Sequence, residues 1–368
     1  MTIQTLISTK NGLIIGSDRA STTADGKTYE GVHKIFNMSE KHSSVIMINS
    51  NPEFEEVPMK TLIGESKQVI NLDELLTIGE LKEKFFKFVE KNTPKESLND
   101  YLEDKLRIFE IKLRNQIYYS SYNRVIKSSP KKEVYSFLKS YSNYEHEFDH
   151  IIPKNKNKKE ELEKIWQIFS HDLQSYVTGV ILSGYNIKSH FPTFYEFQMI
   201  FNSNKGIVYE DIDCAIDSKD PIIKIFAVNN EGYAFITGVN MKFVEFILNT
   251  VEDLNENVAD DIMLKLEEYD IENKDLIEDI ITESINNEYS GISEDIDDFR
   301  NESIKYTSNS IEYLPMGLLC VLGELLVRLT AVKQKTSSDA ETVSMSNDIV
   351  TTTKTDGIKW IDSIEDTF

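Results

Sequence analysis

Apolar residues in this chain form short strand-like runs near both ends and in its middle. Leu13–Ile15, Val177–Tyr185 and the alternating segment Thr193–Phe197 have the length and composition of β-strands. Ile349–Ile361 contains Asp356-Gly357, a dipeptide typical of hairpin turns. This pattern predicts antiparallel hairpins in the middle and at the end of the chain.

Four longer segments carry apolar residues at helical spacing instead. They are Leu75–Val89, Leu98–Tyr118, Glu252–Glu302 and Leu314–Ala331. The third is densely acidic, so it predicts amphipathic helices with a solvated acidic face, with docking of a basic partner as the alternative. The fourth predicts a long apolar helix.

Length, cysteine content and net charge limit the kinds of protein that this chain can be. At 368 residues the chain exceeds one sheet-and-helix domain, so insertions are expected. No apolar run has the length of a membrane span and no signal peptide is recognisable, which predicts a cytoplasmic protein without membrane contact. Two cysteines, Cys214 and Cys320, indicate a reducing compartment, and the net charge of −22 disfavours nucleic-acid binding.

The candidate chemistry lies at the start of the chain. Thr2 follows an initiator Met that aminopeptidases remove before small residues, which would give Thr2 a free α-amine. An α-amine with a pKa of about 7.7–8.0 can act as general base for a hydroxyl nucleophile. Lys34 would favour the neutral amine and stabilise charge on the Thr oxygen, and Asp18 would be its counter-charge.

Residues 2–38 resemble the opening of proteasome β subunits and of the HslV peptidase, which are N-terminal nucleophile hydrolases. The resemblance rests on Thr2, the Asn11-Gly12 turn, Asp18 and Lys34, which match the family's order without a gap. It implies a strand that begins at the nucleophile, a second strand that ends in the acid, and a lysine that opens the third strand.

The same resemblance implies positions that bind the substrate. Thr22 falls where the family places a small residue whose backbone binds the substrate strand. The family's fourth strand, which corresponds to Ser44–Ser50, supplies the backbone donor of the oxyanion hole. The family uses a Gly amide there, but this strand has no Gly. Ile48, Asn49 and Ser50 are therefore the candidate substrate-binding residues, because a backbone donor needs no particular side chain.

Two later segments extend the resemblance. Gly232–Gly238 resembles the strand and turn before the family's third helix, with Thr237 near a position often held by Ser. In Ser338–Thr342, Asp339 and Thr342 are candidates for an acid and a hydroxyl close to the nucleophile's amine.

The predicted fold is α+β, a four-layer αββα sandwich of the N-terminal nucleophile hydrolase type with helical insertions. The expected segments are the N-terminal half of the core (1–71), a helical insertion (72–170), the core's middle strands and helix (171–250), an acidic helical insertion (251–310), and its final helix and strands (311–368).

The predicted function is that of a threonine-type endopeptidase without cofactor or metal. Thr2 would attack a peptide carbonyl, and water would hydrolyse the resulting ester. The resemblance also implies a peptide or unfolded-protein substrate, a homo-oligomeric ring and an ATP-dependent unfoldase as partner. A noncatalytic ring or scaffold protein is the alternative.

A second alternative comes from His146–His150, which matches H-E-x-x-H and could bind zinc on a helix. Pro153 ends any helix nearby, and no third ligand stands out. The overlapping segment Phe148–Pro153 is similar to the core of HNH nucleases, with His171 as the nearest further histidine. This alternative is a metal-dependent nuclease or zinc peptidase.

Overall fold

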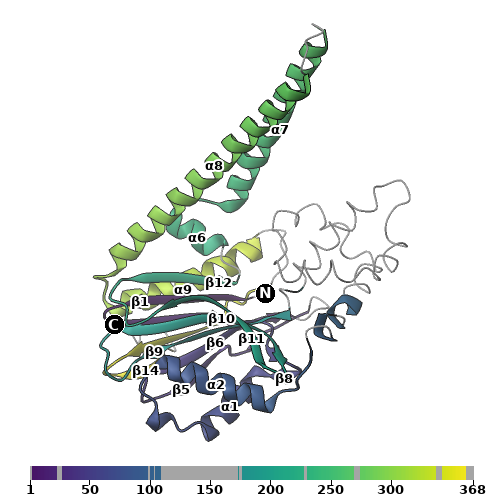
Figure 1. Cartoon of the computed structure of the whole chain (residues 1–368). Coiled ribbons are helices and arrows are strands. Elements are labelled where there is room, and N and C mark those ends of the chain that lie inside the picture. Colours follow the sequence, from purple (N-terminus) through teal and green to yellow (C-terminus); the bar gives the residue numbers. More distant parts are fainter. Residues whose placement is uncertain are drawn as a thin grey trace. The chain divides into compact units, whose positions relative to one another are not determined.

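The computed structural model divides into two compact units (Figure 1). Unit 1 contains Met1–Lys34, Ser189–Pro192 and Asp217–Phe368, and unit 2 contains Ile35–Lys188 and Thr193–Ile216. The described residues are 2–22, 27–97, 100–102, 104–108, 173, 176–227, 230–268, 274–336 and 342–361.

Unit 1 is built on a five-stranded antiparallel sheet in the order β12-β1-β2-β13-β14. The strands are β1 (Ile3–Thr9), β2 (Gly12–Asp18), β12 (Ile222–Ala227), β13 (Asn347–Thr353) and β14 (Gly357–Ile361). Every residue of β1 and β2 is buried, which explains the apolar run at Leu13–Ile15. The hairpin predicted at the end of the chain is confirmed as β13 and β14.

The strand register places the end of β2 beside the start of two other elements. In the β1–β2 pair, Gln4 lies opposite Ser17, so the first residues of the chain lie near Asp18. In the β2–β13 pair, Asp18 lies opposite Asn347. Asp18 therefore sits where the N-terminus and the segment before β13 converge.

Helix α9 (Met316–Thr336) packs on β1, β2 and β13 and confirms the predicted long apolar helix. Its Gly323 allows close approach, because a Cβ there would lie only 3.0 Å from Ile14 Cγ2. Gly16 on β2 is equally crowded, since a Cβ would lie 2.6 Å from Thr5 Oγ1. Small residues at both positions let the helix lie flat on the sheet.

The prediction of a strand at Gly232–Gly238 is wrong, because most of this segment lies in helix α6 (Asn230–Thr237). The buried residues Gly232 and Ile236 are four positions apart and so share one helix face. Gly232 packs so closely on Ile225 that a Cβ would lie 2.5 Å from its Cδ1. A short apolar run does not distinguish the two structures by its pattern alone.

The acidic segment forms two long helices, α7 (Met241–Glu268) and α8 (Lys274–Ile311), which lie side by side (Figure 1). This confirms the prediction of helices there. Several of their large apolar side chains are exposed, including Phe243, Phe246 and Phe299. Docking of a basic partner on this pair stays a prediction.

Unit 2 contains a second antiparallel sheet, in the order β11-β10-β9-β6-β5. Its strands are β5 (Ile35–Ser39), β6 (Ser44–Ser50), β9 (Thr178–Tyr185), β10 (Pro192–Ser203) and β11 (Gly206–Ala215). The neighbouring strands β9 and β10 confirm the hairpin pair predicted in the middle of the chain. Short strands β7 (Glu53–Phe54) and β8 (Val57–Pro58) form a tight hairpin after β6.

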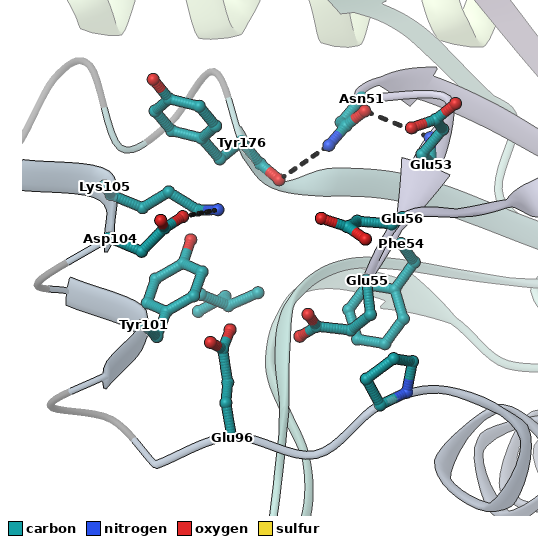
Figure 2. A pocket seen from close by; sticks show the side chains of 12 residues that line it. Asn51, Glu53, Phe54, Glu55, Glu56, Glu96, Tyr101, Asp104, Lys105 and Tyr176 are labelled. Carbon is teal, nitrogen blue, oxygen red and sulfur yellow. Dashed lines mark hydrogen bonds and ion pairs between the residues drawn. The ribbon is translucent and has the colours of Figure 1, made fainter. Parts of the chain in front are cut away.

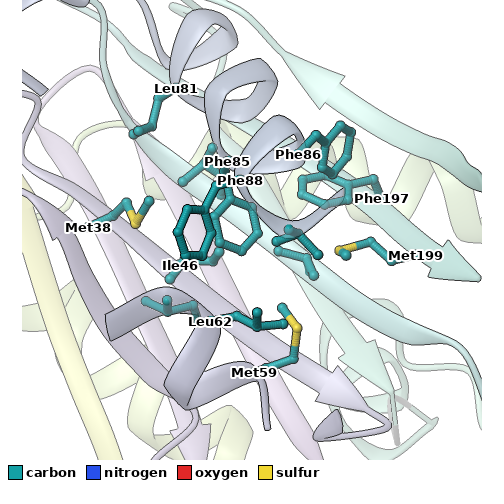
Figure 3. Packing of buried hydrophobic residues seen from close by; sticks show 14 of the residues in the cluster. Met38, Ile46, Met59, Leu62, Leu81, Phe85, Phe86, Phe88, Phe197 and Met199 are labelled. Atoms are coloured by element: carbon teal, nitrogen blue, oxygen red, sulfur yellow. The ribbon is translucent and has the colours of Figure 1, made fainter. Parts of the chain in front are cut away.

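Helices α1 (Met59–Val69) and α2 (Ile78–Asn92) cover this sheet, and the short 3-10 helix η1 (Leu72–Glu74) joins them. Thr77 and Glu80 form a capping box that starts α2. Phe85 and Phe86 of α2 contribute to a core with Phe197 and Met199 of β10 (Figure 3). The helix predicted at Leu75–Val89 is thus confirmed from Ile78 onward, since the residues before it lie outside α2. Residues 100–102 and 104–108 of the next predicted helix are helical as well.

The α+β class with antiparallel sheets is confirmed, whereas the four-layer stacking and the domain boundaries stay predictions. Short strands β3 (Ser21–Thr22) and β4 (Thr28–Tyr29) complete the described elements of unit 1. Among the helices in the described ranges, none is long and apolar enough to cross a membrane. His146–His150 and His171 lie outside the described residues.

Candidate active site

Thr2, Asp18 and Lys34 meet in unit 1, at the start of β1. Lys34 Nζ donates a hydrogen bond to Thr2 Oγ1 over 2.7 Å and another to Asp18 Oδ1 over 2.7 Å. The three residues thus form one continuous line of hydroxyl, ammonium and carboxylate. Charge-assisted hydrogen bonds of this length are strong and fix the hydroxyl's position.

Asp18 is fully buried and anchors this group through both carboxylate oxygens. Besides Lys34, Oδ1 accepts a hydrogen bond from Ile3 N over 3.0 Å. Oδ2 accepts hydrogen bonds from Ala20 N over 2.9 Å and from Ser344 N over 3.3 Å. These four donors offset the cost of burying the carboxylate, because a buried polar group is tolerated when it is hydrogen-bonded.

The ammonium group of Lys34 is also buried, with 8% of the residue exposed. Burial lowers the pKa of Lys34 below the ordinary value of 10.5, while the charge of Asp18 partly opposes this shift. The sign of the shift shows that removal from water outweighs the ion pair. A lysine of this kind exchanges protons more readily than a surface lysine.

A second buried carboxylate, Asp348 on β13, was missed by the sequence reasoning. It accepts hydrogen bonds from Arg19 Nε over 2.8 Å and from His33 Nδ1 over 2.9 Å. These partners directly follow Asp18 and precede Lys34 in the chain. Asp348 therefore fixes the positions of Arg19 and His33, which flank the candidate site. Its charge, like that of Asp18, partly opposes the lowering of the pKa of Lys34 by burial.

The segment before β13 contacts Asp18 through the backbone amide of Ser344. Thr342 is held by Gln334 of α9, whose Oε1 accepts from Thr342 N over 2.9 Å and from Val343 N over 3.0 Å. Ser344 N then donates to Asp18. Asp339 lies outside the described residues, so its role and that of Thr342 toward the nucleophile stay predictions.

The predicted substrate-binding residues are placed on strands of different units. Thr22 is half-buried on β3, with its Oγ1 3.2 Å from that of Thr28 on β4. Ile48, Asn49 and Ser50 form the end of β6 in unit 2, so their role toward Thr2 stays a prediction. Asn49 lies over its neighbour Gly179, where a Cβ would be 1.9 Å from Asn49 Oδ1.

Within the described ranges, no group of three or more His, Cys, Asp or Glu side chains is arranged to hold a metal ion. The groups that the described residues bring to Thr2 Oγ1 are the buried ammonium of Lys34 and, through it, the carboxylate of Asp18.

Comparison with known proteins shows a distant similarity to solved structures. No protein-family model matches this sequence. No curated protein matches it either. Among solved structures, a Gly-1 mutant of Anbu from Hyphomicrobium sp. strain MC1 aligns with 9% identity and a TM-score of 0.31, over 65% of this chain and 66% of Anbu.

The predicted assignment to the proteasome β-subunit and HslV family is therefore wrong: no family model supports it, and the Anbu similarity is too distant to assign a family. The aligned region is just under two thirds of the Anbu chain. The ring assembly and the unfoldase partner were implied by that resemblance, and they stay predictions.

Proposed function

We propose that this protein is a threonine-type hydrolase that cleaves peptide bonds, with Thr2 as the nucleophile after removal of Met1. The observation that carries the proposal is the hydrogen-bonded line from Thr2 Oγ1 through Lys34 Nζ to Asp18 Oδ1, with 2.7 Å at each step. A buried cation that donates to the hydroxyl can stabilise the negative charge that develops on the oxygen during nucleophilic attack. The distances support this chemistry independently of any family assignment.

In the proposed reaction, Thr2 Oγ attacks the carbonyl carbon of the substrate while its proton passes to the free α-amine of Thr2. The tetrahedral intermediate collapses, the C–N bond breaks, and the departing amine takes that proton. Water then attacks the acyl ester and releases the carboxylic acid product. The hydroxyl and the amine are both restored at the end of the cycle.

Lys34 and Asp18 would act as a unit in this reaction. Lys34 stabilises negative charge on Thr2 Oγ during attack, and its positive charge favours the neutral, proton-accepting form of the amine. Asp18 is held by three backbone amides, so it cannot rotate away from Lys34. Such preorganised charges act most strongly where water is excluded.

A covalent probe tests the proposal directly. A peptide epoxyketone bonds both the hydroxyl and the free α-amine of an N-terminal threonine. Intact-mass spectrometry of the purified protein should show loss of Met1 and a one-to-one adduct with the mass of the probe. Thr2→Ala should give no adduct, whereas Thr2→Ser should retain it because the hydroxyl remains.

Thr5→Ser is the matched control, because this threonine is buried on the same strand but cannot become the N-terminal residue. Its adduct should equal that of the native protein. Retention of Met1, or a processed protein that reacts with no probe sequence, would contradict the proposal and favour the noncatalytic scaffold alternative.

A further inference from the structure

A pocket of about 380 Å³ lies within unit 2, beside the β7–β8 hairpin (Figure 2). One wall comes from this hairpin, and the opposite wall comes from Tyr101, the helical residues that follow it, and Tyr176. The volume falls in the range of small-ligand pockets. All lining residues belong to unit 2, so an inference from this pocket does not depend on the proposed chemistry of Thr2.

Carboxylates dominate the described lining. They come from five residues, Glu53, Glu55, Glu56, Glu96 and Asp104. The only lining cation in this part of the chain is Lys105. The described lining thus carries an excess of four negative charges when all of these groups are ionised.

Two of these carboxylates are held close together. Glu55 is fixed by a hydrogen bond of 2.7 Å from Asn202 N, and Figure 2 shows Glu96 extending toward it. Burial raises the pKa of both groups, and the charge of Glu55 raises that of Glu96 further. Like charges confined in this way favour a ligand that brings positive charge.

Besides the excess of carboxylates, the buried side chain of Tyr101 also indicates a ligand-binding pocket. Its ring stacks on Phe201 with centroids 4.9 Å apart, and only 4% of the residue is exposed. Within the described residues, its buried hydroxyl has no hydrogen-bond partner. A buried hydroxyl without a partner costs about 1–3 kcal/mol, which a ligand that bonds to it would recover.

Lys105 shows which chemical group the aromatic part of the pocket accepts. Its Nζ lies 5.2 Å from the ring centroid of Tyr101 and 5.2 Å from that of Tyr176. It also forms an ion pair of 3.2 Å with Asp104. An ammonium group between two tyrosine rings and beside a carboxylate is a typical cation–π site.

We propose that this pocket binds an organic cation, an ammonium or guanidinium group, which takes the place of Lys105 between Tyr101 and Tyr176 and pairs with Glu55 and Glu96. The described residues offer no metal-binding group, and the pocket is far larger than a single ion needs. The cation could come from a free polyamine or from a basic side chain of a peptide. The hydroxyl of Tyr101 would accept a hydrogen bond from its N–H.

Calorimetric titration of the full chain with spermidine and with N-acetyl-arginine amide tests the proposal. The Thr2→Ala background removes any contribution from hydrolysis, and N-acetyl-glutamine amide is the uncharged control ligand. Glu96→Gln should weaken binding about tenfold or more, because it removes a charged hydrogen-bond acceptor. Glu65→Gln is the matched control, since it makes the same change at an exposed position of α1 and should leave affinity unchanged.

Lys105→Ala should have the opposite effect and tighten binding, because it empties the place between the two rings. This variant keeps the proposal testable if Glu96→Gln fails to fold. Binding of spermidine alone would identify a free polyamine as the source, and binding of the arginine amide alone a basic side chain. No binding of either, equal weakening by Glu96→Gln and Glu65→Gln, or weaker binding by Lys105→Ala would overturn the proposal.

Discussion

Lys34 Nζ lies 2.7 Å from Thr2 Oγ1 and belongs to the same hydrogen-bonded line as the buried carboxylate of Asp18. The ammonium is removed from water, and among the described residues Asp18 is the one carboxylate that it contacts directly. This balance makes the charge of Lys34 sensitive to pH, and with it the proposed activity.

We expect peptidase activity to fall on the alkaline side with a midpoint below 10.5, the ordinary pKa of a lysine. The sign follows from burial: the folded protein lowers the pKa of Lys34, so the proton that the reaction needs is lost at a lower pH than in the unfolded chain. A pH profile of kcat/KM measures this. Lys34→Arg keeps its charge, so any activity it retains should lack this alkaline limb.

The same linkage predicts how stability changes. Between the pKa of Lys34 in the folded protein and 10.5, the unfolded chain binds more protons than the folded protein does, so the contribution of Lys34 makes folding more favourable as pH rises.

For the activity profile, an identical alkaline limb in the native protein and in Lys34→Arg would mean that another group controls activity.

Asp18→Asn should lower the free energy of unfolding by about 3–5 kcal/mol, because it leaves Lys34 buried without its anionic partner. The amide also cannot accept all four hydrogen bonds made by the carboxylate. Urea unfolding of both proteins measures the difference. Asp213→Asn, at an exposed position on β11, is the matched control and should change stability by less than about 0.5 kcal/mol.

Gln334→Ala should lower both stability and activity although Gln334 is not expected to touch substrate. Its side chain holds Thr342 and Val343, and so positions Ser344 N against Asp18. We expect a loss of about 1–3 kcal/mol for the unsatisfied backbone groups. Activity should fall mainly through kcat, and Gln334→Glu should restore part of it because its carboxylate can still accept these hydrogen bonds.

Lys333→Ala serves as the control for this residue, since Lys333 is exposed on the same helix. If Gln334→Ala lowered stability but left kcat unchanged at a temperature where it is fully folded, Gln334 would have no positioning role.

Glu56→Gly should stabilise the protein by about 0.5–1 kcal/mol. Glu55 and Glu56 form the turn of the β7–β8 hairpin with φ of 50° and 62°, a left-handed conformation that glycine adopts without strain. Thermal unfolding measures the change. Glu53→Gly on the adjacent strand is the comparison, and it should destabilise because glycine gains nothing in extended backbone.

The sequence was informative where function depends on side chains close together in the chain. Thr2 directly precedes β1, Asp18 ends β2 and Lys34 directly precedes β5. Their order and spacing anticipated the contacts that the structure contains. The contributions of Ser344 and Asp348 could not be anticipated in the same way. They depend on the pairing of β2 with β13, and Ser344 acts through a backbone amide that any residue other than proline could supply.

The sequence was least informative where a short pattern fits two structures. Gly232–Gly238 has the pattern of a strand until the burial of Gly232 and Ile236, four positions apart, is known. The match to H-E-x-x-H at His146–His150 lies outside the described residues, so that alternative stays a prediction. The opening residues matched a family pattern, but no family model matches the chain. A few residues in register specify a local geometry more reliably than they specify ancestry.

The order of strands in unit 1 also determines when during synthesis the sheet can form. β1 and β2 leave the ribosome first, but their neighbours β12 and β13 come from residues 222–227 and 347–353. Until these later strands emerge, both edges of the first hairpin are open and Asp18 lacks the amide of Ser344. The surroundings of the proposed nucleophile are therefore complete only after residues 344–353 have been synthesised.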